Sequence, residues 1–280
     1  MAKPFDHYLI FKKTYDIIIF VIKRKGGYDF MKKIQFCLTP SAGKRLIAKA
    51  IALLPDVTDA LKEHTVVVIA GTTNAPVAYE LLNIIGDTEG FSAKNFFRGL
   101  TVPEHTSTRS EFIGDVVIEK GKWLRGKTIF DIADNLSSDD IIFKGGNAVN
   151  IADKEAGVLI GNPKVGTAFP ILSAVYGRRS KLYVPIGCEK TVSDKISDIA
   201  SLVNDRESEG LRFLPLPGEV ITELDAIRII SGARGHLIGG GGVLGAEGCS
   251  YFTAEGNDNE LDALLDAVKE VKGEPRYSLD

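Results

Sequence analysis

Apolar runs and amphipathic segments alternate along most of this chain. Residues 65–70 form a continuous run of mainly β-branched side chains, which is typical of a parallel strand buried on both faces. Residues 41–54 place apolar side chains at helical spacing behind a serine, which predicts a helix with an N-cap. By the same criteria we expect strands at 114–118, 128–130, 141–143, 158–160 and 182–186, and helices at 75–85, 168–176, 192–202, 222–230 and 259–271.

This alternation predicts an α/β protein with a doubly wound, mostly parallel sheet and helices on both faces, as in Rossmann-like folds. The sequence has no repeat with a period of about 20 to 50 residues, and no linker rich in proline, serine or glutamine divides it. We therefore expect residues 31–280 to form a single domain whose C-terminal portion, about 235–250, is rich in glycine.

Residues 1–30 differ from the rest of the sequence in their pattern of apolar and aromatic residues. They are apolar and aromatic without a helical period, and they end in Gly26-Gly27 shortly before Met31. Our hypothesis is that they are an N-terminal extension, added by an upstream start, which does not belong to the fold. The alternative is an edge hairpin or a helix that packs on the domain.

A small polar loop separates the strand at 65–70 from the helix at 75–85. It consists of Gly71, Thr72, Thr73 and Asn74. Free N–H groups at a helix N-terminus and the positive end of the helix dipole favour an anion, so the loop is a candidate phosphate site. The alternative is that Gly-Thr-Thr only caps the helix.

A second candidate loop follows the apolar strand at 141–143, inside the stretch DIADNLSSDDIIFKGGN that spans 131–147. Ligands of open α/β sheets collect at the C-terminal ends of the strands, where Lys144 would emerge. Gly145 and Gly146 allow backbone amides to approach a ligand, and Asn147 follows them. We expect this loop and the loop at 71–74 to form two ends of one site.

Composition narrows the class of partner. The net charge of -3 and the pI of about 5.9, without a basic stripe, give no reason to expect nucleic-acid binding. The three cysteines are far apart, which argues against a metal site or a disulfide framework and is consistent with the cytoplasm. The apolar stretch at 17–22 is too short to span a membrane. A small metabolite is the expected partner, and a homo-oligomer is an open option.

The motifs of residues 41–190 occur in the order found in a known superfamily. Asp131-Ile-Ala-Asp134 leads through a short acidic loop and a strand to Lys144-Gly-Gly, and the loop at 71–74 follows the first strand. This arrangement resembles the superfamily of ribose-5-phosphate isomerase A, glucosamine-6-phosphate deaminase and the CoA-transferases. The isomerase branch is the most similar, with the same spacing between the first aspartate and the lysine.

The resemblance implies catalytic roles for four residues. Lys144 would stabilise the oxyanion of an enediolate, because a cation is held where negative charge develops. Asp131 and Asp134 would act in ring opening and in proton shuttling at the sugar hydroxyls. Asp153 stands in the place of the family's general base, which is a glutamate on a helix. The reaction uses neither a cofactor nor a metal. The alternative is that Asp131 caps a turn and Lys144 is its ion-pair partner.

Three functional classes remain open on these residues. The first is a phosphosugar-binding protein that acts as a cofactor-independent aldose–ketose isomerase. The second is a non-catalytic metabolite-sensing module of the same fold, because a fold does not determine whether its site is catalytic. The third is an enzyme that binds a CoA ester or a nucleotide and uses Glu155, Glu189 or Glu247 as a carboxylate nucleophile.

Overall fold

The computed structural model describes residues 20–21, 32–99, 102 and 111–278. Of the expected N-terminal extension, this part contains only Phe20 and Val21. They form strand β1 (Phe20–Val21), which pairs antiparallel with strand β2 (Lys32–Leu38). The other residues of 1–30 lie outside the described residues, so the extension stays a prediction.

The largest sheet has six strands in the order β11-β9-β6-β3-β4-β5. Strands β11, β9, β6 and β3 run parallel to one another, β4 pairs antiparallel with β3, and β5 pairs antiparallel with β4. Val67, Ile142 and Leu182 lie opposite one another on three neighbouring strands and are all buried, as expected for strands covered on both faces. The strands are β3 (Thr65–Val68), β4 (Val116–Glu119), β5 (Lys122–Trp123), β6 (Ile141–Phe143), β9 (Lys181–Pro185) and β11 (Glu219–Ile221).

Both faces of this sheet are covered. Val66 and Val68 pack with the helices of one face, and Val67 packs with the elements of the other, as the alternation of side chains along a strand requires. The first face carries α1 (Pro40–Ile51), α2 (Pro55–Glu63) and α3 (Asn74–Ile84), and the 3-10 turn η1 (Ala93–Asn95) contacts α3. The second carries α4 (Ile129–Ile132), η2 (Ala133–Asn135), α5 (Ala168–Leu172) and the π-helical turn η3 (Ser173–Gly177).

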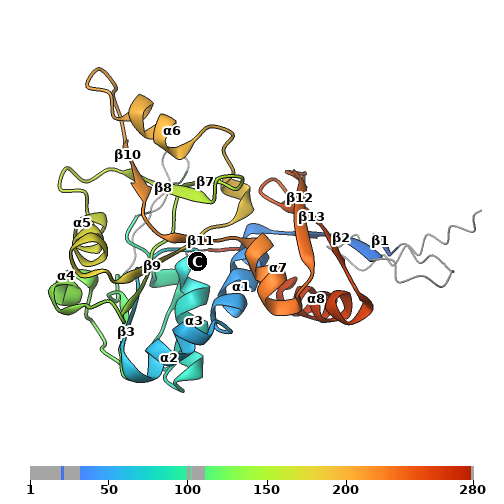
Figure 1. Ribbon diagram of the computed structural model, residues 1–280, viewed down its shortest axis with the longest axis horizontal. Coiled ribbons are helices and arrows are strands. Elements are labelled where there is room, and N and C mark those ends of the chain that lie inside the picture. The colour runs from blue at the N-terminus through green and yellow to red at the C-terminus, as the bar shows by residue number, and fades with distance from the viewer. Residues whose placement is uncertain (1–19, 22–31, 100–101, 103–110, 279–280) are drawn as a thin grey trace, which may run out of the picture.

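A small antiparallel sheet, in the order β10-β8-β7, also covers the second face, and helix α6 packs against it. Figure 1 shows this sheet and α6 at one end of the molecule. The bounds are β7 (Ala148–Asn150), β8 (Glu155–Ile160), η4 (Cys188–Lys190), α6 (Ile196–Val203) and β10 (Arg212–Leu216).

A four-stranded antiparallel sheet, β1-β2-β13-β12, lies beside the main sheet (Figure 1). Strand β2 pairs with β13 along its whole length, and the rings of Phe36 and Phe252 stack with centroids 5.6 Å apart. Helix α1 contacts α3, which covers the main sheet, and it also contacts α7 and α8, which pack on the four-stranded sheet. It therefore joins the two sheets. The remaining bounds are α7 (Glu223–Ser231), β12 (Arg234–Gly240), β13 (Ser250–Gly256) and α8 (Asp258–Val271).

The α/β class is confirmed, but the doubly wound order is not. The parallel strands β3, β6, β9 and β11 follow one another across the sheet on one side of β3. On its other side the chain forms only β4 and β5, through antiparallel pairings, so the second parallel half of a doubly wound sheet is absent from the described strands. The predicted strand at 128–130 is wrong, because this segment opens α4. Thr128 and Asp131 form a reciprocal capping box there, which favours a helical turn.

No helix in the described part of the chain is both long and apolar enough to cross a lipid bilayer.

Candidate functional site

Four parallel strands of the main sheet end at one edge, and the loops that follow them hold the candidate site. These loops are 69–74 after β3, 144–147 after β6, 186–190 after β9 and Thr222-Glu223 after β11. Ligands of open α/β sheets bind outside the carboxyl ends of the parallel strands, which is this edge. Two of the loops were expected from the sequence, and the structure places them on neighbouring strands.

The loop at 71–74 presents backbone N–H groups at the N-terminus of α3. Asn74 and Ala75 donate their own N–H groups to the carbonyl oxygen of Gly71 at 3.0 and 2.9 Å. Thr73 is the N-cap, and its side chain makes no capping hydrogen bond. In the described chain, no group accepts from the N–H of Thr72 or Thr73. These donors and the dipole of the 11-residue helix therefore favour an anion.

Asn74 ties this loop to the next strand. Its side-chain amide donates to the carbonyl oxygens of Ile69 at 2.8 Å and Phe143 at 3.1 Å, and the residue is 1% exposed. The amide thereby satisfies two carbonyl groups at the ends of β3 and β6. A Cβ atom built on Gly145 would lie 3.8 Å from Asn74 Oδ1, so Asn74 and Gly145 lie close together.

Lys144 is a half-buried cation that forms no ion pair with any described carboxylate. Its backbone N–H donates to the carbonyl oxygen of Tyr183 at 3.0 Å, which fixes it at the end of β6. No described residue forms a hydrogen bond or an ion pair with its ammonium group. Burial lowers the pKa of Lys144 to about 8; the charges of Arg98 and Lys190 lower it too, and Asp115 opposes them.

Lys190 connects the two glycine-containing loops. Its ammonium group donates to the carbonyl oxygen of Gly146 at 2.9 Å and lies 3.5 Å from the hydroxyl oxygen of Thr73. Burial lowers the pKa of Lys190, and the nearby charge of Lys44 on α1 lowers it further. Lys44, Lys144 and Lys190 therefore concentrate positive charge at the strand ends, and an anionic ligand would relieve their mutual repulsion.

Two glutamates flank these lysines. Glu223 is 2% exposed, and its Oε2 accepts the backbone N–H of Cys188 at 2.7 Å. A Cβ atom on Gly43 would overlap Oε1 of Glu223, so α1 approaches this carboxyl group through a glycine. Burial raises the pKa of Glu223 to about 7, and the charge of Glu189 raises it as well. At neutral pH Glu223 is consequently a mixture of protonated and ionised forms.

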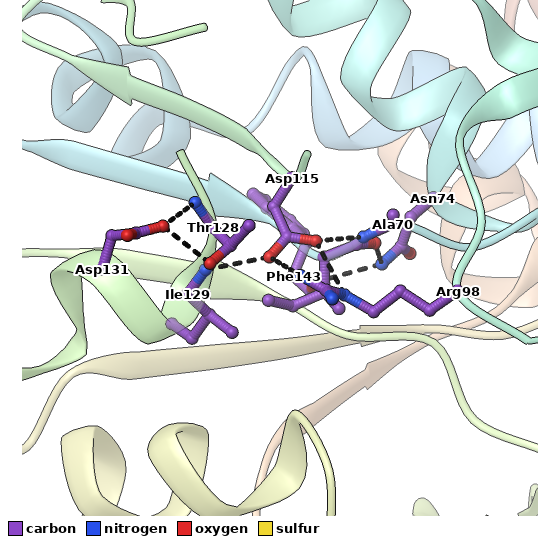
Figure 2. A network of polar contacts seen from close by, with 9 residues as sticks. Ala70, Asn74, Arg98, Asp115, Thr128, Ile129, Asp131 and Phe143 are labelled. Carbon is purple, nitrogen blue, oxygen red and sulfur yellow. Dashed lines mark hydrogen bonds and ion pairs between the residues drawn. The ribbon is translucent and has the colours of Figure 1, made fainter. Parts of the chain in front are cut away.

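Asp115 organises the other side of the site (Figure 2). Its carboxylate is completely buried and accepts hydrogen bonds from the N–H of Ala70 and of Ile129, both at 2.9 Å. The guanidinium group of Arg98 donates to both carboxylate oxygens, at 2.8 and 3.3 Å. The carboxylate of Asp115 thus bonds to the end of β3, to the start of α4 and to Arg98, whose charge lowers the pKa of Lys144.

The predicted catalytic aspartates lie in other surroundings. Asp131 is exposed on α4, where its Oδ2 accepts from the N–H and the hydroxyl group of Thr128, both at 2.7 Å. These hydrogen bonds lower the pKa of Asp131. The carboxylate of Asp134 is 92% exposed and pairs with Arg178 at 3.1 Å. The capping role that we considered for Asp131 is confirmed, but no ion pair joins Asp131 to Lys144 in the described chain.

Asp153 and Asn147 belong to the small sheet. The helix that the resemblance implied after Lys144-Gly-Gly is wrong, because β7 and β8 form an antiparallel hairpin there. Asp153 is exposed in the turn of this hairpin, with its N–H bound to Asn150 Oδ1 at 3.0 Å. Asn147 Oδ1 accepts the N–H of Leu159 at 3.0 Å, so this side chain stabilises the sheet. Their predicted roles in the site stay predictions.

Comparison with known proteins gives no relative. No protein-family model, no curated protein and no solved structure matches this chain.

Proposed function

We propose that this protein binds a small phosphorylated metabolite at the ends of its parallel strands, and that phosphorylated sugars are the leading class. The observation that carries this proposal is the half-buried ammonium group of Lys144, which has no counter-ion in the described chain. A cation withdrawn from water gains stability from an anion that binds beside it. The N–H groups of Thr72 and Thr73, which no described residue accepts, add hydrogen-bond donors suited to phosphate oxygens.

For the reaction we infer aldose–ketose isomerisation through an enediolate, without a cofactor. Lys144 would hold the developing oxyanion, because an electrostatic donor fixed in a partly buried site stabilises charge that appears during the reaction. Asp131, Asp134 and Asp153 stay the proposed acid–base groups on the resemblance alone. The proposed chemistry needs neither a nucleic acid nor a membrane, and it is compatible with the cytoplasm.

A non-catalytic metabolite sensor is the second candidate, and one observation favours it. The carboxylates of Asp131, Asp134 and Asp153 make no hydrogen bond or ion pair with Lys144 in the described chain. A protein with the cation and the phosphate loop, but without a positioned base, would bind the metabolite without turnover. An enzyme for CoA esters or nucleotides is a further option, because Glu189 lies at the same strand ends.

Ligand screening followed by a turnover assay separates these candidates. Ribose 5-phosphate, glucosamine 6-phosphate, nucleotides and CoA esters are tested for thermal stabilisation, since a ligand that binds the folded state raises its stability. We expect stabilisation by sugar phosphates. Exchange of a substrate C–H proton in D2O, followed by NMR, then reports isomerase chemistry. Binding without exchange would support the sensor, and stabilisation only by CoA esters or nucleotides would contradict the phosphosugar proposal.

Removing either half-buried lysine of the site is expected to weaken phosphate binding. We expect Lys144→Ala and Lys190→Ala each to raise the Kd for a stabilising sugar phosphate by at least about tenfold, the size of a charge-assisted contact worth roughly 1.5 kcal/mol. Isothermal titration calorimetry measures the change. Lys62→Ala removes an exposed lysine of α2 and serves as the control for net charge. Equal Kd values for all three variants and the wild type would remove both lysines from the site.

The affinity for a phosphate ligand is expected to fall above pH 8. Lys144 has a pKa of about 8, so its ammonium group loses its proton as the pH rises through this value. A phosphomonoester stays dianionic there, because its second pKa is about 6. Titrations between pH 7 and pH 9.5 should show Kd rising with pH in the wild type and a flatter profile in Lys144→Met. Parallel profiles for the two proteins would contradict this assignment.

A further inference from the structure

Two buried oxygen atoms at the strand ends accept no hydrogen bond from any described residue. They are Oδ1 of Asn74 and Oε2 of Glu189. Buried polar atoms are nearly always paired, because an unpaired one loses its bonds to water and gains nothing in return. Such atoms, at a site where the ammonium group of Lys144 also has no hydrogen-bond partner among the described residues, indicate groups that a ligand satisfies.

The orientation of Asn74 is determined by its neighbours. Both hydrogen bonds to carbonyl oxygens, those of Ile69 and Phe143, require the amide nitrogen as the donor. A flipped side chain would place oxygen against two carbonyl oxygens, so Oδ1 must be the free atom. Figure 2 shows Asn74 at the end of the network opposite Asp131. Its Oδ1 faces Gly145, whose missing side chain leaves room beside it.

Glu189 is held beside the same loops. It lies on η4 directly before Lys190, which contacts Gly146 and Thr73. Its carboxylate folds back over its own loop, where a Cβ atom on Gly187 would overlap Oε2. The glycine therefore fixes Glu189 as an acceptor next to the lysines. Asn74 therefore lies beside Gly145, and Glu189 directly precedes Lys190, whose ammonium group contacts Gly146.

We propose that the ligand carries hydroxyl or amino groups in addition to its phosphate, and that Asn74 Oδ1 and the Glu189 carboxylate bind these donors. This inference rests on the proposed function and sharpens its substrate class. Lysines alone would accept any compact anion. The two acceptors bind only groups that donate hydrogen bonds, so they favour a phosphate compound that carries hydroxyl or amino groups. A phosphate compound with an apolar chain would leave these buried acceptors unpaired, which lowers its affinity.

A matched pair of ligands tests this preference. Glycerol 3-phosphate and propyl phosphate have the same carbon skeleton and phosphate group, and only the former carries hydroxyl groups. Isothermal titration of the wild-type protein should give a Kd for glycerol 3-phosphate at least about tenfold lower than for propyl phosphate, as expected when a polar site loses its partner. Inorganic phosphate is titrated in parallel as a probe of the cationic part of the site.

Two variants locate the preference. Glu189→Met removes one acceptor at similar volume, with the exposed Glu63→Met of α2 as its control. Gly145→Ala places a methyl group 3.8 Å from Asn74 Oδ1 and makes only ordinary contacts, so the fold should tolerate it while the acceptor is covered. Gly177→Ala, whose methyl group would meet no atom within 4 Å, is the matched control. Each site variant should reduce the ratio of the Kd for propyl phosphate to the Kd for glycerol 3-phosphate, because any change in phosphate binding affects both ligands and cancels in this ratio.

The outcomes separate this inference from the proposed function. If inorganic phosphate and both organic phosphates bind with equal affinity in the wild type, the donor inference is overturned and phosphate binding stands. If both site variants keep the wild-type preference, Asn74 and Glu189 are not its source and the inference is overturned too. If no phosphate compound binds, the proposed function fails and the inference fails with it. Should Glu189→Met not fold, Gly145→Ala alone decides.

Discussion

Asp115→Ala is expected to lower the free energy of unfolding by about 3 kcal/mol, near the lower end of the range for breaking a buried ion pair. The substitution removes the acceptor of four hydrogen bonds, which come from the N–H groups of Ala70 and Ile129 and from Arg98. Buried N–H groups without a partner keep their desolvation cost. The loss stays near the lower end because the side chain of Arg98 is 28% exposed and regains water.

Urea unfolding, followed by circular dichroism, measures this effect. Asp139→Ala removes an exposed aspartate outside this network and should change the unfolding free energy by less than about 0.5 kcal/mol. Asp115→Asn keeps one oxygen acceptor and should fall between the alanine variant and the wild type. In Asp115→Asn the decline of ligand affinity should also begin at a lower pH than in the wild type, because the charge of Asp115 raises the pKa of Lys144. A loss below about 1 kcal/mol in Asp115→Ala would show that the network contributes little.

The second large effect is a dependence of stability on pH that comes from Glu223. Its pKa is about 7 in the folded protein and 4.5 in the unfolded chain, so folding favours its protonated form. The contribution of protonated Glu223 to the free energy of unfolding is fully present below pH 4.5 and is lost as the pH rises through 7. A shift of this size corresponds to on the order of 3 kcal/mol. Three groups face Glu223. The charge of Glu189 adds to the pKa shift, and Cys188 donates its N–H to the carboxyl group. The charge of Glu223 in turn raises the pKa of Lys190.

Glu223→Gln isolates this contribution. Glutamine keeps the oxygen that accepts the N–H of Cys188 and carries no charge at any pH. Urea unfolding at several values between pH 4.5 and pH 8 should show similar stability for the two proteins at the acidic end. At the basic end the variant should be the more stable protein. Glu63→Gln, on the exposed surface of α2, should follow the wild type. Curves of wild type and Glu223→Gln that stay parallel over the whole range would contradict the prediction.

The parts of the site that were predicted from the sequence depend on local signals. A buried strand followed by small polar residues and a helix indicates a ligand-binding loop, and both such loops, at 71–74 and 144–146, lie at the same edge of the sheet. The misread segment also carried a usable signal. Thr128 and Asp131 are three residues apart, which is the spacing of a capping box, and this local pattern outweighed the short apolar run that suggested a strand.

The groups that the sequence did not single out are assembled by tertiary contacts. Glu223 reaches the site because α7 packs against α1, where Gly43 leaves room for its carboxyl group. Asp115 has four hydrogen bonds to three separate segments, and nothing in its local sequence indicates this. Lys190 follows a predicted strand, as Lys144 does, and this shared position was the one signal that could have identified it.

The pairing of β2 with β13 has a consequence for synthesis of the protein. β2 begins at Lys32 and its partner ends at Gly256, so almost the whole chain must leave the ribosome before this sheet can form. Bringing the ends of so long a loop together costs conformational entropy before the strand contacts can form, so such pairings form slowly. Until then Phe36 lacks Phe252, its stacking partner, and an apolar strand edge is exposed on the nascent chain. The main sheet, whose strands lie between residues 65 and 221, has all of its own strands available earlier.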